Sequence, residues 1–269
     1  MKRILLIILL ITSIAIIGCT EEVKSSNNEK SILTEEKTAK NEEQFTRETE
    51  HIKFYYYEKN AAYIGDMAET IEGEYDRIVE DLQVKNIDQK INFTIYPTLE
   101  EFHKAISMPD ASDWIVGLCT GPYTLQMVSP NSDGLELEHD YNSLMNVATH
   151  EFTHALTKIQ YPKLGQRWLI ESVALYETNQ FYEPKSFSYL VEGNYPSIKE
   201  LNATNGKSAE KVYNVGYILI EYINENWSMD EVRELLKENG DIERVLGVTE
   251  GEFEKEFYKY LEEEYLESN

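Results

Sequence analysis

The sequence predicts an α+β fold: a small mixed β-sheet with helices in a first lobe, then a helical second lobe. Two observations lead to this prediction. Short segments rich in aromatic and β-branched residues, which are typical of strands, are concentrated between residues 51 and 128. After about residue 141 the apolar residues recur at helical spacing, with loops between the helices.

The first 19 residues, MKRILLIILLITSIAIIGC, place two positive charges before a short apolar run, which is typical of a secretory signal. The segment Ile16-Ile17-Gly18-Cys19 resembles the lipobox of bacterial lipoproteins. This resemblance implies that residues 1–18 are a signal peptide and that Cys19 carries lipid. The protein would then be anchored at the extracytoplasmic face of a bacterial cell membrane. The alternative is an ordinary cleaved signal in which Cys19 has no role.

The rest of the N-terminal segment, residues 19–50, is polar and contains few aromatic residues, so we expect a disordered tether. The whole chain carries a formal net charge of −24, which argues against nucleic acid as a partner and against electrostatic adhesion to anionic lipid. If Cys19 is lipidated, Cys119 is the only thiol left, and an intramolecular disulfide is excluded.

The first lobe, residues 51–160, is predicted to follow the order β-α-β-α-β-β and to end with a helix. We expect the strand 123–129, YTLQMVS, to be the sheet edge on which an extended peptide could lie. The elements before that helix are predicted at residues 51–57, 60–82, 91–97, 99–106, 114–117 and 123–128.

The second lobe, residues 161–269, is predicted to be helical. Two of its helices begin with the spacing of a capping box, in which two side chains satisfy each other's backbone amides. These pairs are Ser228 with Glu231 and Thr249 with Glu252.

The segment His150-Glu151-Phe152-Thr153-His154 carries the HExxH pattern. Histidines four residues apart lie on one face of a helix, so both imidazoles could bind one Zn²⁺. Glu151 is offset from that face and could reach a water molecule at the metal. The alternative is two polar histidines on a solvated helix. Against it, the opposite face collects apolar residues: Leu144, Ala148, Phe152, Ala155 and Ile159.

A catalytic zinc needs a third protein ligand and one open position. Downstream, the segment RWLIESVALY, residues 167–176, is predicted to form a second helix and carries Glu171 after a tryptophan. Glu171 is therefore the candidate for the third ligand.

HEFTH followed by WLIESVALY resembles the gluzincin metallopeptidases, most closely the peptidase MA-like group with its pattern HExxH, then W-L-x-E-G-x-A. The resemblance extends from about residue 52 to the C-terminus. It implies a zincin-like fold, with His150, His154 and Glu171 as zinc ligands and Glu151 as the general base.

The sequence departs from the family pattern at two positions. Ser172 replaces a common glycine, a small-for-small change that we expect to be tolerated. Leu175 stands where thermolysin-type enzymes have an aspartate that orients a ligand, so the sequence identifies no orienting partner for His150.

A further candidate comes from the segment KVYNVGYILIEYI, which resembles the Y-x-x-G helix start of aminopeptidase-type gluzincins. The resemblance implies that the Tyr213 hydroxyl stabilises the oxyanion of the tetrahedral intermediate. The chain has 19 tyrosines, so a purely structural tyrosine is the alternative.

The sequence thus predicts a zinc peptidase that acts on a peptide or protein substrate. The region GLCTGPYTLQMVSPN lacks the glutamate with which related aminopeptidases hold a free N-terminus, which favours endopeptidase cleavage. Cys119 has no neighbours that mark it as a nucleophile. Two alternatives remain: a zincin scaffold that only binds, and a helical lipoprotein without metal.

Overall fold

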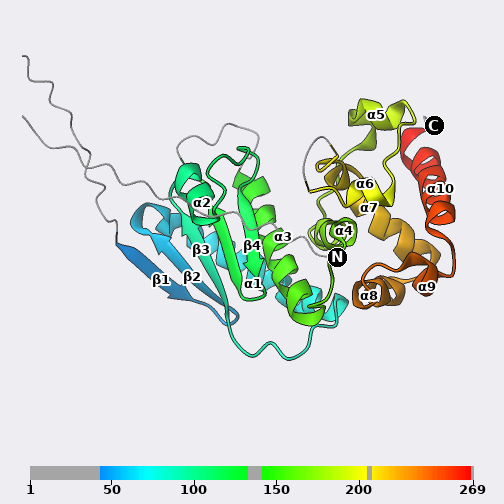
Figure 1. The fold of residues 1–269 in the computed structure, drawn as a ribbon. Helices are drawn as coiled ribbons and strands as arrows, with labels where there is room; N and C mark the ends of the chain where they lie inside the picture. Colours follow the sequence, from blue (N-terminus) through cyan, green and yellow to red (C-terminus); the bar gives the residue numbers. More distant parts are fainter. Residues whose placement is uncertain (1–42, 133–140, 205–207, 268–269) are drawn as a thin grey trace, which may run out of the picture. The chain divides into compact units, whose positions relative to one another are not determined.

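The computed structural model describes residues 43–132, 141–204 and 208–267 (Figure 1). The expected signal segment, Cys19 and the expected tether up to residue 42 lie outside these ranges. The described residues belong to one compact unit. Among them, no helix combines the length and the apolar character needed to cross a membrane.

The strands precede most of the helices along the chain, which confirms the α+β prediction (Figure 1). Besides short 3-10 and π-helical turns, the elements are β1 (Gln44–Glu48), β2 (Ile52–Tyr57), α1 (Ala61–Asp81), β3 (Ile91–Tyr96), α2 (Leu99–Ala105), β4 (Gly117–Gly121), β5 (Thr124–Val128), α3 (Tyr141–Gln160), α4 (Arg167–Glu177), α5 (Ser188–Val191), α6 (Ile198–Leu201), α7 (Lys211–Asn226), α8 (Met229–Lys237), α9 (Ile242–Leu246) and α10 (Glu250–Leu261).

The strands form a mixed five-stranded sheet in the order β1-β2-β3-β5-β4. The inner pairs β2–β3 and β3–β5 are parallel, whereas β1 and β4 pair antiparallel with their neighbours. Strand β5 therefore lies inside the sheet, and the prediction that residues 123–129 form an edge is wrong. The edge on this side is β4, because the Gly121–Pro122 turn folds it back outside β5.

One face of the sheet forms part of the core. Alternate residues of the three inner strands are fully or almost fully buried, and the residues between them are mostly partly exposed, as expected for a sheet covered on one side. Helix α1 packs against β2 and against α3, and α3 contacts β4 and β5. The buried residues are Ile52, Phe54, Ile91, Phe93, Ile95, Leu125 and Met127. The sheet thus supports α3, the helix that carries the HExxH residues.

Strand β1 was not expected, since residues 19–50 were predicted to be a disordered tether. That prediction is wrong for residues 44–48. All five side chains of β1 are exposed, so the segment shows no apolar pattern. Backbone pairing with β2 holds it in place, and Glu48 adds ion pairs with Lys53 at 3.1 Å and Lys90 at 3.2 Å.

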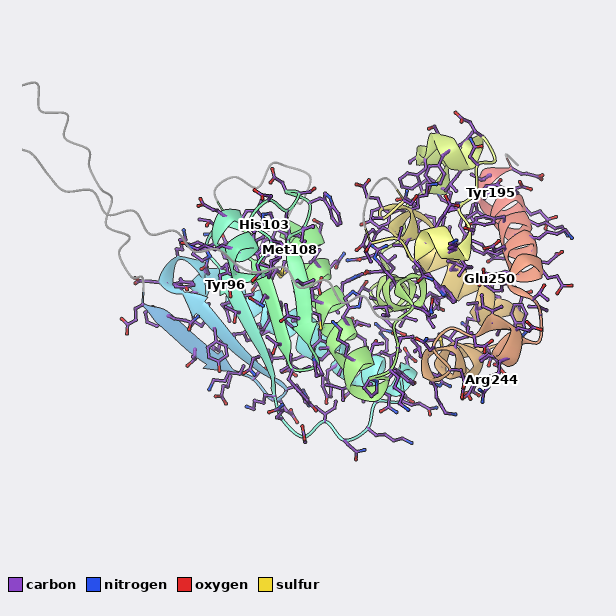
Figure 2. All side chains as sticks on the ribbon, viewed as in Figure 1. Tyr96, His103, Met108, Tyr195, Arg244 and Glu250 are labelled. Atoms are coloured by element: carbon purple, nitrogen blue, oxygen red, sulfur yellow. The ribbon has the colours of Figure 1, made fainter. Side chains whose placement is uncertain are left out.

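The strand predicted at residues 114–117 begins later, at Gly117. The residues before it form a turn, in which the Ile115 amide donates to the Ser112 carbonyl at 2.9 Å. His103 of α2, labelled in Figure 2, fixes this turn through a 2.9 Å contact between its Nε2 and the Ile115 carbonyl. The turn places Trp114 outside the sheet, where 39% of it is exposed.

The helix starts agree in part with the predicted capping boxes. At α10, Thr249 and Glu252 satisfy each other's backbone amides, which confirms the box. At α8, Ser228 accepts from the Asp230 amide, while Glu231 contacts the serine hydroxyl rather than its backbone. The second box is therefore incomplete. A box that the sequence analysis did not identify, Ser197 with Glu200, begins α6.

Helices α4 and α7 pack closely at Gly216. A Cβ on Gly216 would lie 2.8 Å from Leu175 Cδ1 and 2.9 Å from Ser172 Oγ, both closer than normal contacts. Ser172 and Leu175 are completely buried. Gly216 therefore leaves room for the Ser172 side chain.

Replacing Gly216 with alanine is expected to lower the free energy of unfolding by about 1–3 kcal/mol, because the methyl group would overpack the α4–α7 contact. The matched control is Gly73→Ala in α1, where a Cβ would meet nothing within 4 Å. That change should raise stability by roughly 0.5–1 kcal/mol through helix propensity. Urea unfolding of both variants measures the difference; equal stability changes would contradict the packing account.

A contact between the half-exposed Arg77 and the buried Glu177 joins α1 to the end of α4. The Glu177 side chain is 1% exposed, and its Oε2 lies 2.6 Å from Arg77 Nη1. The Arg77 guanidinium also donates to the Glu177 carbonyl, and it pairs with Asp81 at 3.1 Å. Glu177 Oε1 has no hydrogen-bond partner. Burial, helped by the nearby Asp81, raises the pKa of Glu177 to about 7 in spite of Arg77.

This raised pKa predicts a pH-dependent stability. Between about pH 4.5 and 7 the folded chain keeps a proton on Glu177 that the unfolded chain has lost. The bound proton makes its full contribution to the free energy of unfolding at about pH 4.5 and below. This contribution is lost as the pH rises to about 7. The free energy of unfolding of Glu177→Gln, relative to that of wild type, should therefore rise by on the order of 2–3 kcal/mol between pH 4.5 and 8. Urea unfolding at both pH values tests this; a constant difference would contradict it.

Candidate metal centre

Helix α3 is buried around the HExxH residues. His150, Glu151 and His154 are only 6–8% exposed, which excludes the alternative of two histidines on a solvated helix. The opposite face is buried, as predicted, with Ala148, Phe152 and Ala155 completely shielded from solvent. Three threonines spaced by four residues need no outside partner, since each donates to the carbonyl four residues earlier: Thr149, Thr153 and Thr157.

The two histidines face a cleft of about 920 Å³, here called the α3–α4 cleft. One wall comes from residues 114–119, which include the start of the edge strand β4. The other walls come from α4, from residues 179–182 and from the start of α7. The cleft brings together all five candidate residues of the site: His150, Glu151, His154, Glu171 and Tyr213.

The imidazoles and carboxylates are spaced for a metal ion. One ligand atom each from His150, Glu151 and His154 lie within 4.8 Å of one another. Glu171 Oε2 lies 3.4 Å from Nε2 of His150 and 3.4 Å from Nε2 of His154. In a tetrahedral zinc site with bonds of about 2.0–2.1 Å, neighbouring ligand atoms are about 3.3 Å apart. The residues could therefore hold a metal ion.

Two carboxylates thus lie near the histidines, and their surroundings differ. Glu171 Oε1 lies 3.7 Å from the Arg167 guanidinium, while its Oε2 faces both imidazoles. Glu151 Oε2 is buried without a hydrogen-bond partner. Glu171 Oε2 lies 3.4 Å from both Nε2 atoms, whereas the group formed by Glu151 with the two histidines has ligand atoms up to 4.8 Å apart.

The charges at the centre are coupled. Burial alone would raise the pKa of Glu171, but the imidazoles of His154 and His150 hold it well below its usual range. Burial opposes protonation of His154, yet the Glu171 carboxylate outweighs burial and raises the pKa of that imidazole. A buried anion that draws positive charge to its neighbours is suited to binding a cation.

Strand β4 approaches α3 closely at Gly117. A Cβ on Gly117 would lie 2.9 Å from Val147 Cγ1 and 3.0 Å from Glu151 Cγ. Glycine at this position lets the edge strand pass directly beside Glu151. Strand β4 therefore lies next to the candidate metal centre.

Tyr213 lies in the first turn of α7 and faces the α3–α4 cleft. The Arg167 guanidinium lies over its ring, 5.4 Å from the centroid, and Trp114 contacts it edge-on at 6.1 Å. Burial, followed by the negative charge of Glu171, raises the pKa of Tyr213. Its hydroxyl therefore stays protonated at neutral pH and is available as a hydrogen-bond donor.

Cys119 also lines the α3–α4 cleft, but it is a poor nucleophile. Its thiol donates to the Gly121 carbonyl at 3.2 Å. Burial raises its pKa to about 11, so the reactive thiolate is scarce at neutral pH. The sequence-based exclusion of cysteine catalysis is consistent with this environment.

The structure adds two residues that the sequence analysis missed. Gln180 Oε1 lies 3.0 Å from His150 Nδ1, and no sequence signal pointed to it. Arg167 contacts both Glu171 and Tyr213 and donates to the Ala203 carbonyl at 2.9 Å. The spacing of four residues between Arg167 and Glu171 could have indicated their contact.

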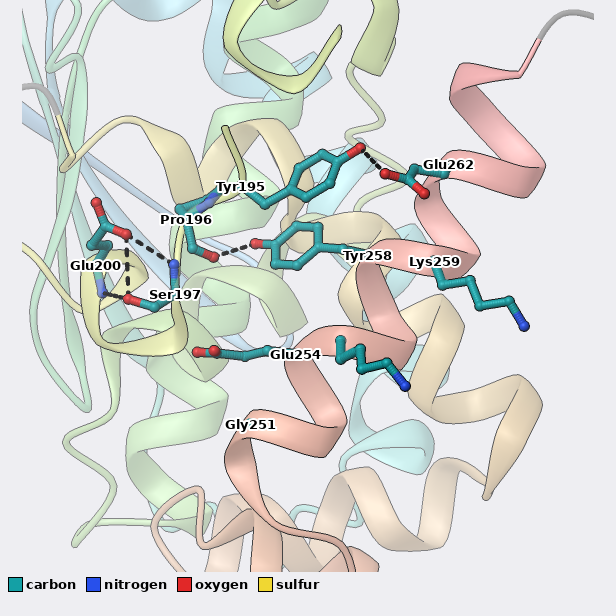
Figure 3. Close-up of a pocket in the computed structure, with 10 residues that line it drawn as sticks. Tyr195, Pro196, Ser197, Glu200, Gly251, Glu254, Tyr258, Lys259 and Glu262 are labelled. Carbon is teal, nitrogen blue, oxygen red and sulfur yellow. Dashed lines mark hydrogen bonds between the residues drawn. The ribbon is translucent and has the colours of Figure 1, made fainter. Parts of the chain in front are cut away.

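A second hollow, of about 600 Å³, lies between residues 195–200 and α10 (Figure 3). The Tyr195 and Tyr258 rings stack there at 4.5 Å, and the Tyr258 hydroxyl donates to the Pro196 carbonyl. Its described lining holds glutamates, lysines and tyrosines but neither histidine nor cysteine. The chemistry of a metal centre is therefore confined, among the described residues, to the α3–α4 cleft.

Comparisons with protein-family models and with curated proteins found no match to the chain.

Proposed function

We propose that the chain is a zinc metallopeptidase of the gluzincin type, with His150, His154 and Glu171 as the zinc ligands. The observation that carries this proposal is the position of Glu171 Oε2, 3.4 Å from the Nε2 atoms of both histidines. Three ligands leave the fourth position open, as hydrolysis requires. The zincin-like assignment of the fold rests on the same residues.

Bound zinc would supply a Lewis acid that acidifies a water molecule and polarises the substrate carbonyl. Glu151 is the general base, since its Oε2 is buried and makes no hydrogen bond in the protein. Its carboxylate takes the proton from the attacking water and delivers it to the leaving amine. A scaffold that only binds would have no use for this unpaired carboxylate, whose burial is costly.

The protonated hydroxyl of Tyr213 donates a hydrogen bond to the oxyanion that forms during attack. Arg167 over its ring and Trp114 at its edge restrict the orientation of the phenol. Arg167 also lies near Glu171 Oε1 at 3.7 Å, which leaves the other carboxylate oxygen for the metal.

The substrate is an extended stretch of a peptide or protein that pairs with the outer edge of β4 at Gly117, beside Glu151. Such pairing uses backbone hydrogen bonds and therefore accepts an internal segment of a chain. The two cations of the cleft are already engaged: Lys158 donates to the Cys119 carbonyl at 2.5 Å, and Arg167 is held as described. This favours endopeptidase over carboxypeptidase action.

The signal segment and Cys19 support a location at the extracytoplasmic face of a bacterial membrane, through the lipid on Cys19. With a net charge of −24, the chain itself would not adhere to anionic lipid or to nucleic acid. Replacing Cys19 with alanine is expected to release the protein from the membrane fraction or to leave its signal uncleaved. Unchanged labelling by radioactive palmitate would contradict the lipid anchor.

The experiment that tests the proposed activity is digestion of an unstructured protein, with the products identified by mass spectrometry. Residues 20–269 should produce internal cuts that a zinc chelator abolishes and added zinc restores. Removal of residues only from the chain ends would contradict endopeptidase action, and products that are insensitive to chelation would contradict a zinc enzyme.

A further inference from the structure

We infer that Gln180 is a positioning residue of the metal centre, whose side-chain carbonyl orients the His150 imidazole for the metal. This inference rests on the proposed zinc function. It fills the role that the sequence left open, because Leu175 occupies the place of an orienting aspartate and is completely buried against α7.

The hydrogen bond defines which ring nitrogen is free. Gln180 Oε1 lies 3.0 Å from His150 Nδ1. A carbonyl oxygen can only accept, so Nδ1 must carry the hydrogen, and the lone pair is then on Nε2. Nε2 is the atom that faces Glu171 Oε2 at 3.4 Å. The contact with Gln180 thus selects the tautomer that can bind a metal at the centre.

The backbone holds Gln180 in place. Helix α4 ends in a Schellman motif, in which the Gln180 amide donates to the Leu175 carbonyl at 2.9 Å and the Asn179 amide donates to the Tyr176 carbonyl at 3.1 Å. Asn179 adopts the left-handed conformation that this motif needs, with φ of 51°. The chain therefore turns back at residue 179.

Helix α4 and the Schellman motif that ends it together contact both ring nitrogens of His150. Glu171, inside α4, faces His150 Nε2, and Gln180, in the motif that ends α4, faces His150 Nδ1. The imidazole is thereby clamped in position and orientation before any metal arrives. Loss of an outer hydrogen bond of this kind typically weakens metal affinity by about 10–100-fold.

The experiment compares three variants of residues 20–269 with wild type. Gln180→Met keeps the length of the side chain but removes the acceptor, and Gln180→Glu keeps an acceptor and adds charge. The control is Gln160→Met, the same exchange at the far end of α3, where Oε1 accepts from the Lys85 amide at 2.9 Å. Competition with a chromogenic chelator gives each zinc dissociation constant, and ¹⁵N NMR of the metal-free imidazoles reports the tautomer of His150.

We expect Gln180→Met to bind zinc about 10–100-fold more weakly than wild type and to lose the single Nδ1–H tautomer. Gln180→Glu should bind at least as tightly as wild type, and Gln160→Met should not differ from it. Unchanged affinity in Gln180→Met, or equal weakening in both Gln180 variants, would overturn the inference. A wild-type protein that binds no zinc would instead overturn the proposed function, while the tautomer spectrum still tests the hydrogen bond.

Discussion

Replacing Glu151 with glutamine is expected to leave zinc bound and the fold intact while removing most of the peptidase activity. The amide has nearly the shape of the carboxylate but cannot take the proton of the attacking water. General acid–base assistance is worth about 10² to 10⁴-fold, and Glu151 is proposed to act both in attack and in departure of the amine. We therefore expect a loss of kcat towards the upper end of that range.

Initial rates on an internally quenched peptide measure this loss, and metal analysis of the same preparation measures the zinc. The matched control is Glu72→Gln, which changes a glutamate that contacts His51 outside the cleft, at 2.6 Å. The control should keep both its bound zinc and the wild-type rate of peptide cleavage. Cleavage by Glu151→Gln at the wild-type rate would contradict the role of general base, even with zinc bound.

Replacing Glu171 with alanine is expected to remove zinc binding and activity together. Its Oε2 is the atom that lies 3.4 Å from Nε2 of both imidazoles. Loss of a direct ligand should weaken zinc affinity by more than the 10–100-fold typical of an outer hydrogen bond.

The measurement is again chelator competition, read together with the rate at saturating zinc. Glu221→Ala serves as the control, because this glutamate of α7 contacts the Tyr265 hydroxyl away from the cleft. It should retain wild-type zinc affinity. If Glu171→Ala kept wild-type zinc affinity, the third ligand would have to be Glu151. Its carboxylate lies close enough to His150 and His154 to bind a metal with them.

The sequence predicted the long helices and an inner strand well because each has a strong local signal. The apolar spacing of residues 60–82 corresponds to α1 at Ala61–Asp81, and the alternation of residues 91–97 corresponds to β3 at Ile91–Tyr96. The HExxH spacing placed both histidines on the cleft face of α3, because four residues make about one helical turn.

The sheet edges could not be predicted in the same way. Strand β1 has no apolar side chains facing a core and is defined by pairing with a strand that follows it in the chain. The place of β5 between β3 and β4 depends on which partners it finds in space. Local composition contains neither kind of information.

The candidate site was predictable only in part for a related reason. The distance between Glu171 and the histidines depends on how α4 packs against α3, which the sequence suggested only through a family resemblance. Gln180 carried no signal because its role depends on a backbone motif at Asn179 that turns the chain back towards α3. Hydrogen bonds that fix a ligand's orientation cannot be identified before that turn is known.

The most direct test of the central claim is a titration of zinc into the metal-free protein, with bound metal and peptidase rate measured on the same samples. The account predicts that the rate rises in proportion to bound zinc and levels off at about one zinc per chain. A protein that binds no zinc, or that cleaves peptides at a rate independent of bound zinc, would contradict it.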